Sequence, residues 1–173
     1  IQGCGFAVFC DEKVRDSFIE GGSGSDSESP EMPDYLPDRY EAGTLPTPAI
    51  VTLGSGIRYL KKIGMKEIRE RLSSYSERLY DRLTSIAGIR PLARSDSGVI
   101  SFTYGDCPSS KIADALDRRG ICTRSGLHCA PAAHRKFGTT ETGAVRASLS
   151  VMNTEREIDG FADALCDIIA GGI

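Results

Sequence analysis

Two different spacings of apolar residues occur along this chain, and they constrain its fold more than any other feature. Residues 65–86 carry apolar side chains every three or four positions, which predicts a long amphipathic helix with a stripe facing the core. Residues 99–104 and 145–149 instead alternate apolar with polar side chains, as strands with one buried face do. A chain with both patterns packs helices against a sheet.

Further elements are expected around these three: helices that begin after Pro48, at Pro108 and at Thr154, and short strands at 89–92 and 121–124. The first of these helices should end at Gly64, and Thr154 with Glu157 has the pattern of a capping box. The resulting order of elements predicts an α+β fold with a mostly antiparallel sheet packed against helices.

The first third of the chain has a different character. Residues 5–10 form a continuous apolar run typical of a strand buried on both faces, as in a parallel sheet. No strand–helix–strand succession follows, so the run is interpreted as a remnant of a larger α/β domain, or as an edge strand of this one. Residues 20–38 are rich in Gly, Ser, Asp, Glu and Pro, which predicts a disordered linker.

Composition excludes several classes of function. The net charge of −3 and pI near 5.5 argue against a nucleic-acid partner, and no apolar run approaches the roughly 20 residues of a membrane span. The six cysteines have irregular spacing and form no C-x-x-C pair, which favours a reducing, cytoplasmic setting. Cys122, His128, Cys129 and His134 lack the paired spacing of zinc ligands, so no metal is expected.

The segment 124–131, Arg-Ser-Gly-Leu-His-Cys-Ala-Pro, carries the strongest chemical signal. It places Cys129 beside His128 and near arginines, and nearby positive charge favours the reactive thiolate. Arg146 lies in an alternating strand on the side opposite the apolar residues, where its planar fork suits a carboxylate. Together they predict a nucleophilic cysteine next to an anchor for an amino acid. A buried structural cysteine and a solvated strand arginine are the alternatives.

These motifs resemble the C-terminal part of cysteine desulfurases, which are fold-type I pyridoxal-phosphate enzymes of the class V aminotransferase group. The resemblance lies in R-x-G-x-H-C-A at 124–130, E-A-G-T at 41–44 and Asn153-Thr154, and it covers most of the chain from Leu36 onward. It implies a small C-terminal domain at 46–173, preceded at 1–45 by a remnant of the large cofactor-binding domain and an active-site loop.

The resemblance also implies roles for individual residues. Cys129 would take the sulfur of L-cysteine as a persulfide and leave L-alanine, with pyridoxal 5'-phosphate as the electron sink. His128 would support it by tuning the thiol or relaying a proton, or would simply hydrogen-bond the loop. Arg146 would hold the substrate carboxylate. Arg124 would lie near the substrate, although a surface arginine at a strand end fits its position equally well.

Gly43-Thr44 is similar to the family's segment that reaches the cofactor phosphate across a dimer. A hydroxyl and an N–H near a helix start suit a phosphate, but they also suit an ordinary helix cap. The chain departs from the family at Leu45-Pro46, where Pro-Asn is common. The opening Gln2 to Gly5 is similar to the stretch after the cofactor lysine, so that lysine is expected upstream of Ile1 and absent from this chain.

The sequence therefore predicts the C-terminal portion of a cysteine desulfurase that serves sulfur transfer, as in iron–sulfur cluster assembly, and that is inactive as this fragment. Its expected partners are L-cysteine or a related small amino acid, a sulfur-acceptor protein and a second copy in a homodimer. Two alternatives stay open. One is a selenocysteine lyase or another class V enzyme, and the other is a non-catalytic module for dimerisation or acceptor docking.

Overall fold

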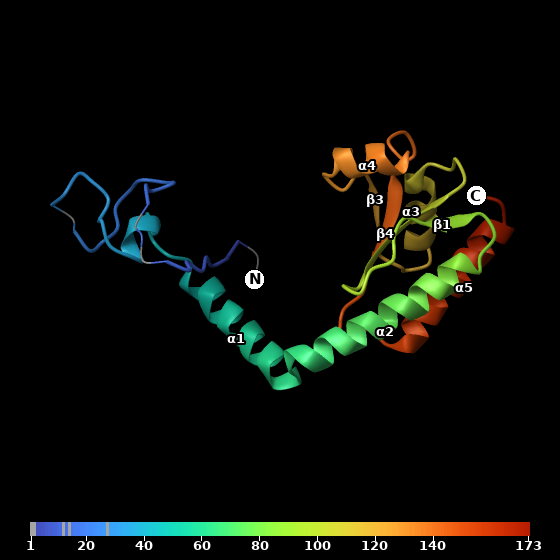
Figure 1. Cartoon of the computed structure of the whole chain (residues 1–173), viewed down its shortest axis with the longest axis horizontal. Coiled ribbons are helices and arrows are strands. Elements are labelled where there is room, and N and C mark those ends of the chain that lie inside the picture. The colour runs from blue at the N-terminus through green and yellow to red at the C-terminus, as the bar shows by residue number, and fades with distance from the viewer. Residues whose placement is uncertain (1–2, 12, 14, 27) are drawn as a thin grey trace. The chain divides into compact units, whose positions relative to one another are not determined.

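The computed structural model describes residues 3–11, 13, 15–26 and 28–173, and its contacts divide the chain into two compact units (Figure 1). The units are Ile1–Lys62 and Ile63–Ile173. The division therefore falls later in the chain than the boundary at residue 45 that the sequence suggests. The assignment of residues 1–45 to a larger domain stays a prediction.

The described residues of the first unit form the 3-10 helix η1, Asp38–Tyr40, and the helix α1, Thr47–Ile63. The helix expected after Pro48 is thus confirmed, together with its end at Gly64. The strand expected at 5–10 is wrong for this chain, because these residues pair with no strand and Phe6 and Val8 are 70% and 76% exposed. A strand is stable only when neighbouring strands take up its backbone hydrogen bonds, and the described part of this unit supplies none.

No regular helix or strand precedes Asp38 among the described residues of 20–38. Arg39 ties this segment together, since its guanidinium donates to the carbonyls of Met32 and Pro33, both at 3.3 Å. Whether the segment is disordered in solution stays a prediction.

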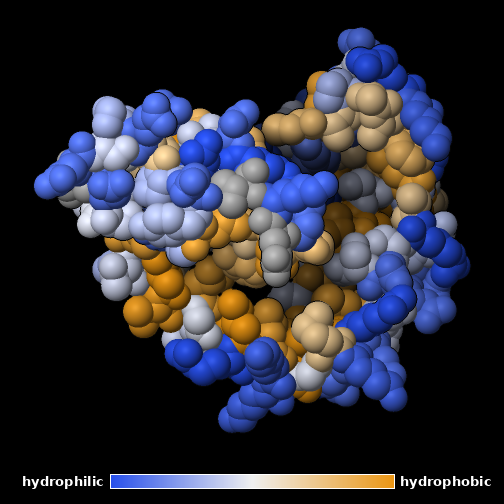
Figure 2. Space-filling model, turned by 60° about the vertical axis from the view of Figure 1, so that its left-hand side comes forward, coloured by the Kyte–Doolittle hydropathy of each residue, from blue (hydrophilic) through white to orange (hydrophobic). Residues whose placement is uncertain are grey.

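The helix α1 presents much apolar surface. Ala49 is its buried residue, whereas Ile50, Val51 and Leu60 are each more than 40% exposed. Figure 2 shows hydrophobic residues among the hydrophilic ones on one face of the molecule. Scattered apolar side chains are ordinary on a protein surface, but a helix with an exposed apolar face normally packs against something else.

The second unit is built on a four-stranded sheet in the order β1-β2-β4-β3, with every neighbouring pair antiparallel. Its strands are β1 Ile89–Pro91, β2 Val99–Tyr104, β3 Arg124–Gly126 and β4 Ala144–Ser148. The predicted antiparallel sheet is confirmed. The register pairs Ile100 with Ala147 and Phe102 with Val145, so these four apolar side chains share one face.

Four helices complete this unit: α2 Met65–Thr84, α3 Ser109–Asp117, α4 Pro131–Phe137 and α5 Glu155–Ala170. Helices α2 and α5 lie side by side (Figure 1). Their apolar stripes meet the apolar sheet face in one core, whose largest fully buried members are Leu79, Leu83, Ile100, Phe102, Ile112, Leu116, Val145, Ile158 and Leu165. The core stripe predicted for residues 65–86 is confirmed, except that Met65 is exposed. The apolar spacing of Ile158, Phe161, Leu165 and Ile168 likewise places these four residues of α5 in the core.

Polar contacts fix where α5 begins and how it lies against α2. The Thr154 hydroxyl accepts from the Glu157 N–H and the Glu157 carboxylate accepts from the Thr154 N–H, so the predicted capping box is present. Arg78 on α2 grips Asp159 on α5 through two hydrogen bonds of 3.0 and 2.6 Å. Because this pair is exposed, it orients the two helices more than it stabilises them.

Three local predictions fail for identifiable reasons. The strand expected at 121–124 forms instead at Arg124–Gly126, because the ladder to β4 runs only along 124–126 while Ile121 packs against the core. Helix α4 was not predicted, although Pro131 at its first turn and Gly138 in the left-handed conformation at its end are helix signals. Cys166, whose place beside Leu165 and Ile169 in the last helix suggests packing in the core, is instead exposed, because it lies on the outer face of α5.

No helix in the described part of the chain is both long and apolar enough to span a lipid bilayer.

Candidate functional site

Cys129 lies in the short turn between β3 and α4, at the surface of the second unit. Its φ is 56° and that of His128 is 51°, so two consecutive residues with side chains occupy the left-handed region. This conformation brings the Cβ close to the backbone and costs about 1 kcal/mol or more for each residue. Strain of this kind persists where the surrounding structure imposes it, and it concentrates at functional sites.

His128 is attached to the start of its own loop. Its Nε2 lies 3.2 Å from the carbonyl oxygen of Arg124. A carbonyl only accepts, so this nitrogen carries the hydrogen, and a neutral ring leaves Nδ1 free to accept a proton. Burial lowers the pKa of His128, and the positive charges of Arg146, His134 and Arg124 lower it too, against the opposing effect of the Arg124 hydrogen bond. The lowered pKa therefore favours the neutral ring.

The contacts of His134 indicate a structural role. It is buried in α4, and its Nδ1 lies 2.8 Å from the Thr139 hydroxyl, which is also buried. Its ring centroid is 5.7 Å from that of His128. His134 therefore packs beneath the loop that carries His128 and Cys129.

Arg124 and Arg146 stand directly opposite each other on β3 and β4, so their side chains leave the sheet on the same face. This is the face away from the apolar core, as the alternation around Arg146 predicted, since Val145 and Ala147 are buried in the core. The ion pairs found among the described residues involve neither arginine. Like charges placed opposite each other are destabilising unless an anion lies between or beside them.

A second observation, on the hydrogen bonding of the Arg146 guanidinium, also indicates that a partner is missing. Its Nε is buried and has no hydrogen-bond partner among the residues that the structure describes. An unsatisfied buried donor on a charged group costs about 1–3 kcal/mol. A carboxylate that approached in the plane of the guanidinium would satisfy this nitrogen and neutralise the charge at once.

The sequence did not single out Ser101, which the register places opposite Arg146 on β2. Ser101, Arg146 and Arg124 thus form one polar row across three neighbouring strands. Alternation along each strand assigns all three to a polar face, but only the pairing register shows that they are aligned.

The residues predicted to bind the cofactor phosphate belong to the first unit. Gly43 has a φ of 84°, and its N–H donates to the carbonyl of Gly22 at 2.8 Å, so this amide is already in use. Helix α1 begins only at Thr47, and Thr44 is exposed. The structure therefore leaves the Thr44 hydroxyl, and not the Gly43 amide, available to a phosphate.

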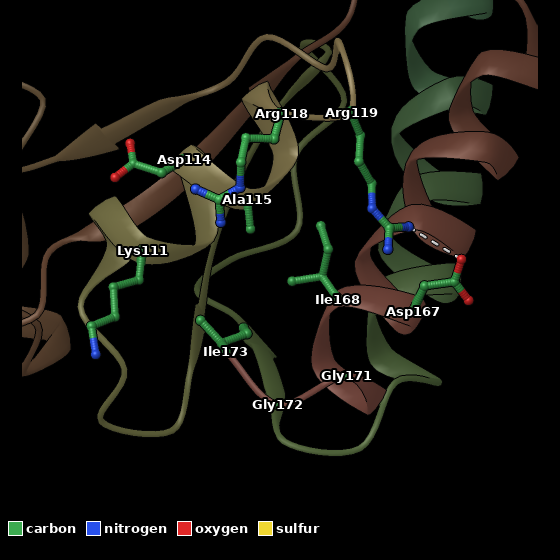
Figure 3. Close-up of a pocket in the computed structure, with 10 residues that line it drawn as sticks. All are labelled: Lys111, Asp114, Ala115, Arg118, Arg119, Asp167, Ile168, Gly171, Gly172 and Ile173. Atoms are coloured by element: carbon green, nitrogen blue, oxygen red, sulfur yellow. Dashed lines mark hydrogen bonds and ion pairs between the residues drawn. The ribbon is translucent and has the colours of Figure 1, made fainter.

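Neither a metal centre nor the pocket beside α3 coincides with these residues. No group of three or more His, Cys, Asp or Glu in the described part of the chain could hold a metal ion. A pocket of about 490 Å³ lies between α3 and the end of α5 (Figure 3). One of its basic side chains, Arg119, is paired with Asp167 at 3.2 Å, and the predicted site residues do not line it.

Comparison with known proteins gives a consistent result. The family model described as Aminotransferase class-V matches residues 7–161. The probable cysteine desulfurase of Methanothermobacter thermautotrophicus is 33% identical, and the match covers 98% of this chain and 44% of that protein. The chain thus spans less than half the length of this relative.

Solved structures agree. The apo structure of a cysteine desulfurase from Thermococcus onnurineus NA1 is 31% identical with a TM-score of 0.72, covering 78% of this chain and 34% of the other. The Escherichia coli cysteine desulfurase CsdA, in its S-sulfonic acid form, has a TM-score of 0.82, covering 91% of this chain and 40% of the other. At 22% identity, the second match shows the fold alone.

The lowered pKa of His128 gives a test of its environment. As pH falls through the ordinary histidine value of 6.5, the unfolded chain takes up this proton first, so folding loses stability. His128→Gln keeps a side-chain donor for the Arg124 carbonyl and removes the titration. The variant should lose less unfolding free energy than the parent chain between about pH 7.5 and about pH 5 in urea titrations. If the unfolding free energy of both proteins has the same pH dependence, His128 is not held in a buried, positively charged environment.

Proposed function

Since this chain belongs to the class-V aminotransferase family, we propose that it forms the C-terminal part of a pyridoxal-phosphate-dependent cysteine desulfurase. Cys129 receives the sulfur of L-cysteine as a persulfide, and L-alanine leaves. One observation carries this proposal: an exposed cysteine sits in a strained turn, in the loop whose His128 is attached to Arg124 and feels the charge of Arg146.

The arginine pair suits the recognition of an amino acid. A substrate carboxylate can bind Arg146 in the plane of its guanidinium and satisfy the unpartnered Nε. Arg124, directly opposite, adds a second positive charge on the same face. The substrate is thereby held by the end that does not react, which leaves its sulfur free to meet Cys129.

The thiol chemistry then needs only residues of this loop. Neutral His128 accepts the Cys129 proton, and the resulting thiolate attacks the substrate sulfur. The new sulfur–sulfur bond forms as the carbon–sulfur bond breaks, and the electron pair stays with the carbon, which takes up a proton to give alanine. Bound pyridoxal phosphate supplies the electron sink that makes this carbon able to hold the pair.

Cofactor binding rests on a smaller set of residues. The exposed Thr44 hydroxyl is the group we assign to the phosphate, reached across a homodimer. All six lysines of the chain are exposed, and none is among the residues that we assign to the site. We therefore expect no sulfide release from this chain alone when it is given cysteine and pyridoxal phosphate. The six free cysteines favour a reducing, cytoplasmic setting. The partner we propose for the next step is a sulfur-acceptor protein.

In the complete protein, Cys129→Ala should abolish persulfide formation and leave cofactor binding unchanged, because the thiol is not part of the phosphate site. Mass spectrometry after treatment with cysteine should find the added sulfur on Cys129. Cys122→Ala is the matched control, since Cys122 is equally exposed but lies outside the turn. Added sulfur on another cysteine, with Cys129 unmodified, would refute the assignment.

Arg146→Lys should weaken substrate capture far more than folding, because the side chain leaves the sheet away from the core. Loss of a bidentate charge-assisted pair corresponds to about 1.5–3 kcal/mol, roughly ten- to a hundred-fold in affinity. The measurement is the cysteine-dependent change in cofactor absorbance of the complete protein. Arg90→Lys, on the far strand β1, is the control. If the Arg146 variant titrates at the same cysteine concentrations as the wild type, Arg146 does not bind the substrate carboxylate, and Arg124 becomes the candidate.

A further inference from the structure

The turn that carries Cys129 is attached to a single short segment, residues 139–143, at both of its ends. At the far end, α4 is held through His134, whose Nδ1 meets the Thr139 hydroxyl at 2.8 Å. The Thr139 N–H donates in return to the His134 carbonyl at 2.9 Å. These two residues are only 5% and 1% exposed, so both polar contacts are made away from solvent.

At the near end, Gly126, the last residue of β3, is held by contacts with Gly143 and Ser109. A Cβ on Gly143 would lie 2.9 Å from the Cα of Gly126 and 2.6 Å from the Ser109 hydroxyl, so the two glycine backbones are in direct contact. The Gly126 N–H donates to the Ser109 hydroxyl at 3.2 Å, and the Ser109 N–H donates to the Thr142 carbonyl at 2.9 Å. Only glycine fits at position 143, where φ is also 66°.

The two attachments are joined inside the segment itself. The Gly143 N–H donates to the Thr139 carbonyl at 2.9 Å, which closes residues 139–143 into one turn. Gly143 is followed at once by β4, a central strand of the sheet. Residues 126 and 134, on either side of Cys129, are thus both held, through residues 139–143, to the start of the same strand, β4.

The turn between these attachments is the strained part. His128 and Cys129 both occupy the left-handed region, whereas the contact made within the turn is one hydrogen bond, from the Ala130 N–H to the Leu127 carbonyl at 2.8 Å. Neither this bond nor the bond from His128 to the Arg124 carbonyl, each worth about 0.5–1.5 kcal/mol, offsets two residues that are strained by about 1–3 kcal/mol each. The conformation must therefore be imposed from the two ends.

We propose that Ser109, His134, Thr139 and Gly143 are positioning residues, which hold the Cys129 turn in its left-handed conformation by fixing both ends to the start of β4. This inference rests on the proposed function, in which Cys129 is the reacting thiol. None of the four residues is assigned to substrate or cofactor above, and they act by keeping the sulfur where an attack on the substrate can occur.

The test uses the whole 173-residue chain and hydrogen exchange of its amides. Thr139→Val keeps the shape of the side chain and removes the bond to His134, whereas Thr139→Ser keeps the hydroxyl. In the valine variant the Ala130 amide should exchange about tenfold faster or more, while amides in the centres of α2 and α5 keep their rates. The serine variant should stay close to the parent chain. The Gly126 amide reports the other end in the same way in Ser109→Ala.

Unchanged exchange at Ala130 in a folded Thr139→Val protein would overturn the proposal. If that variant fails to fold, His134→Leu against His134→Asn carries the comparison, since asparagine can still bond the Thr139 hydroxyl. If Thr139→Val and His134→Leu both unfold, these residues are needed for folding itself, and the positioning role is refuted.

A second readout in the complete protein separates positioning from stability. Thr139→Val should lower the rate at which persulfide forms on Cys129 by about tenfold or more, with substrate affinity and cofactor absorbance unchanged. Faster exchange at Ala130 without a slower persulfide step would also refute the proposal. The exchange experiment needs neither cofactor nor substrate, so a failure of the desulfurase assignment would appear separately, as sulfur transfer that survives Cys129→Ala.

Discussion

The pairing of β4 on both of its edges is the constraint on which the rest of the second unit depends. Because β2 and β3 both run antiparallel to it, one register fixes the position of every side chain on three strands. Val145 and Ala147 enter the core on one face, and Arg146 is forced onto the other. A slip by one residue would bury the arginine and expose the valine, so the core and the candidate anion site stabilise the same register.

That register also explains an arrangement that looks unfavourable by itself. Two arginines stand opposite each other without a counter-charge among the described residues, and one of them has a buried nitrogen without a partner. A protein tolerates such a local cost where a bound anion removes it, and the packing of α2, α5 and the sheet face supplies the stability that keeps the pair in place. The arginine pair is therefore informative about function, because its contribution to the free energy of folding is unfavourable and does not explain its presence.

The Cys129 turn follows the same logic at the level of the backbone. Its two left-handed residues are held between Gly126 and α4, and His128 links the turn back to the arginine strand through the Arg124 carbonyl. The cysteine, the histidine and the arginine pair are thus coupled through short covalent and hydrogen-bonded connections. In the proposed function, this coupling lets one sheet position both the nucleophile and the substrate anchor.

Apolar periodicity was sufficient to predict much of the second unit. The stripe along α2, the alternation in β2 and β4, the capping box of Thr154 and the outward direction of Arg146 all follow from local spacing, because each reflects which side of one element is buried. The motif around Cys129 likewise identified the loop and the family. These features depend on residues close together in the chain.

The sequence could not give what depends on distant partners. Residues 5–10 look like a buried strand, yet they form none here, because a strand exists only when another strand takes up its hydrogen bonds. The alignment of Ser101, Arg146 and Arg124 needed the register, and the two attachments of the Cys129 turn to 139–143 needed the packing of Gly126 against Gly143. Local spacing determined which residues face inward and which cysteine is exceptional. Only the tertiary structure decided what lies opposite each of them, because cross-strand pairing and backbone contact join residues that the sequence keeps apart.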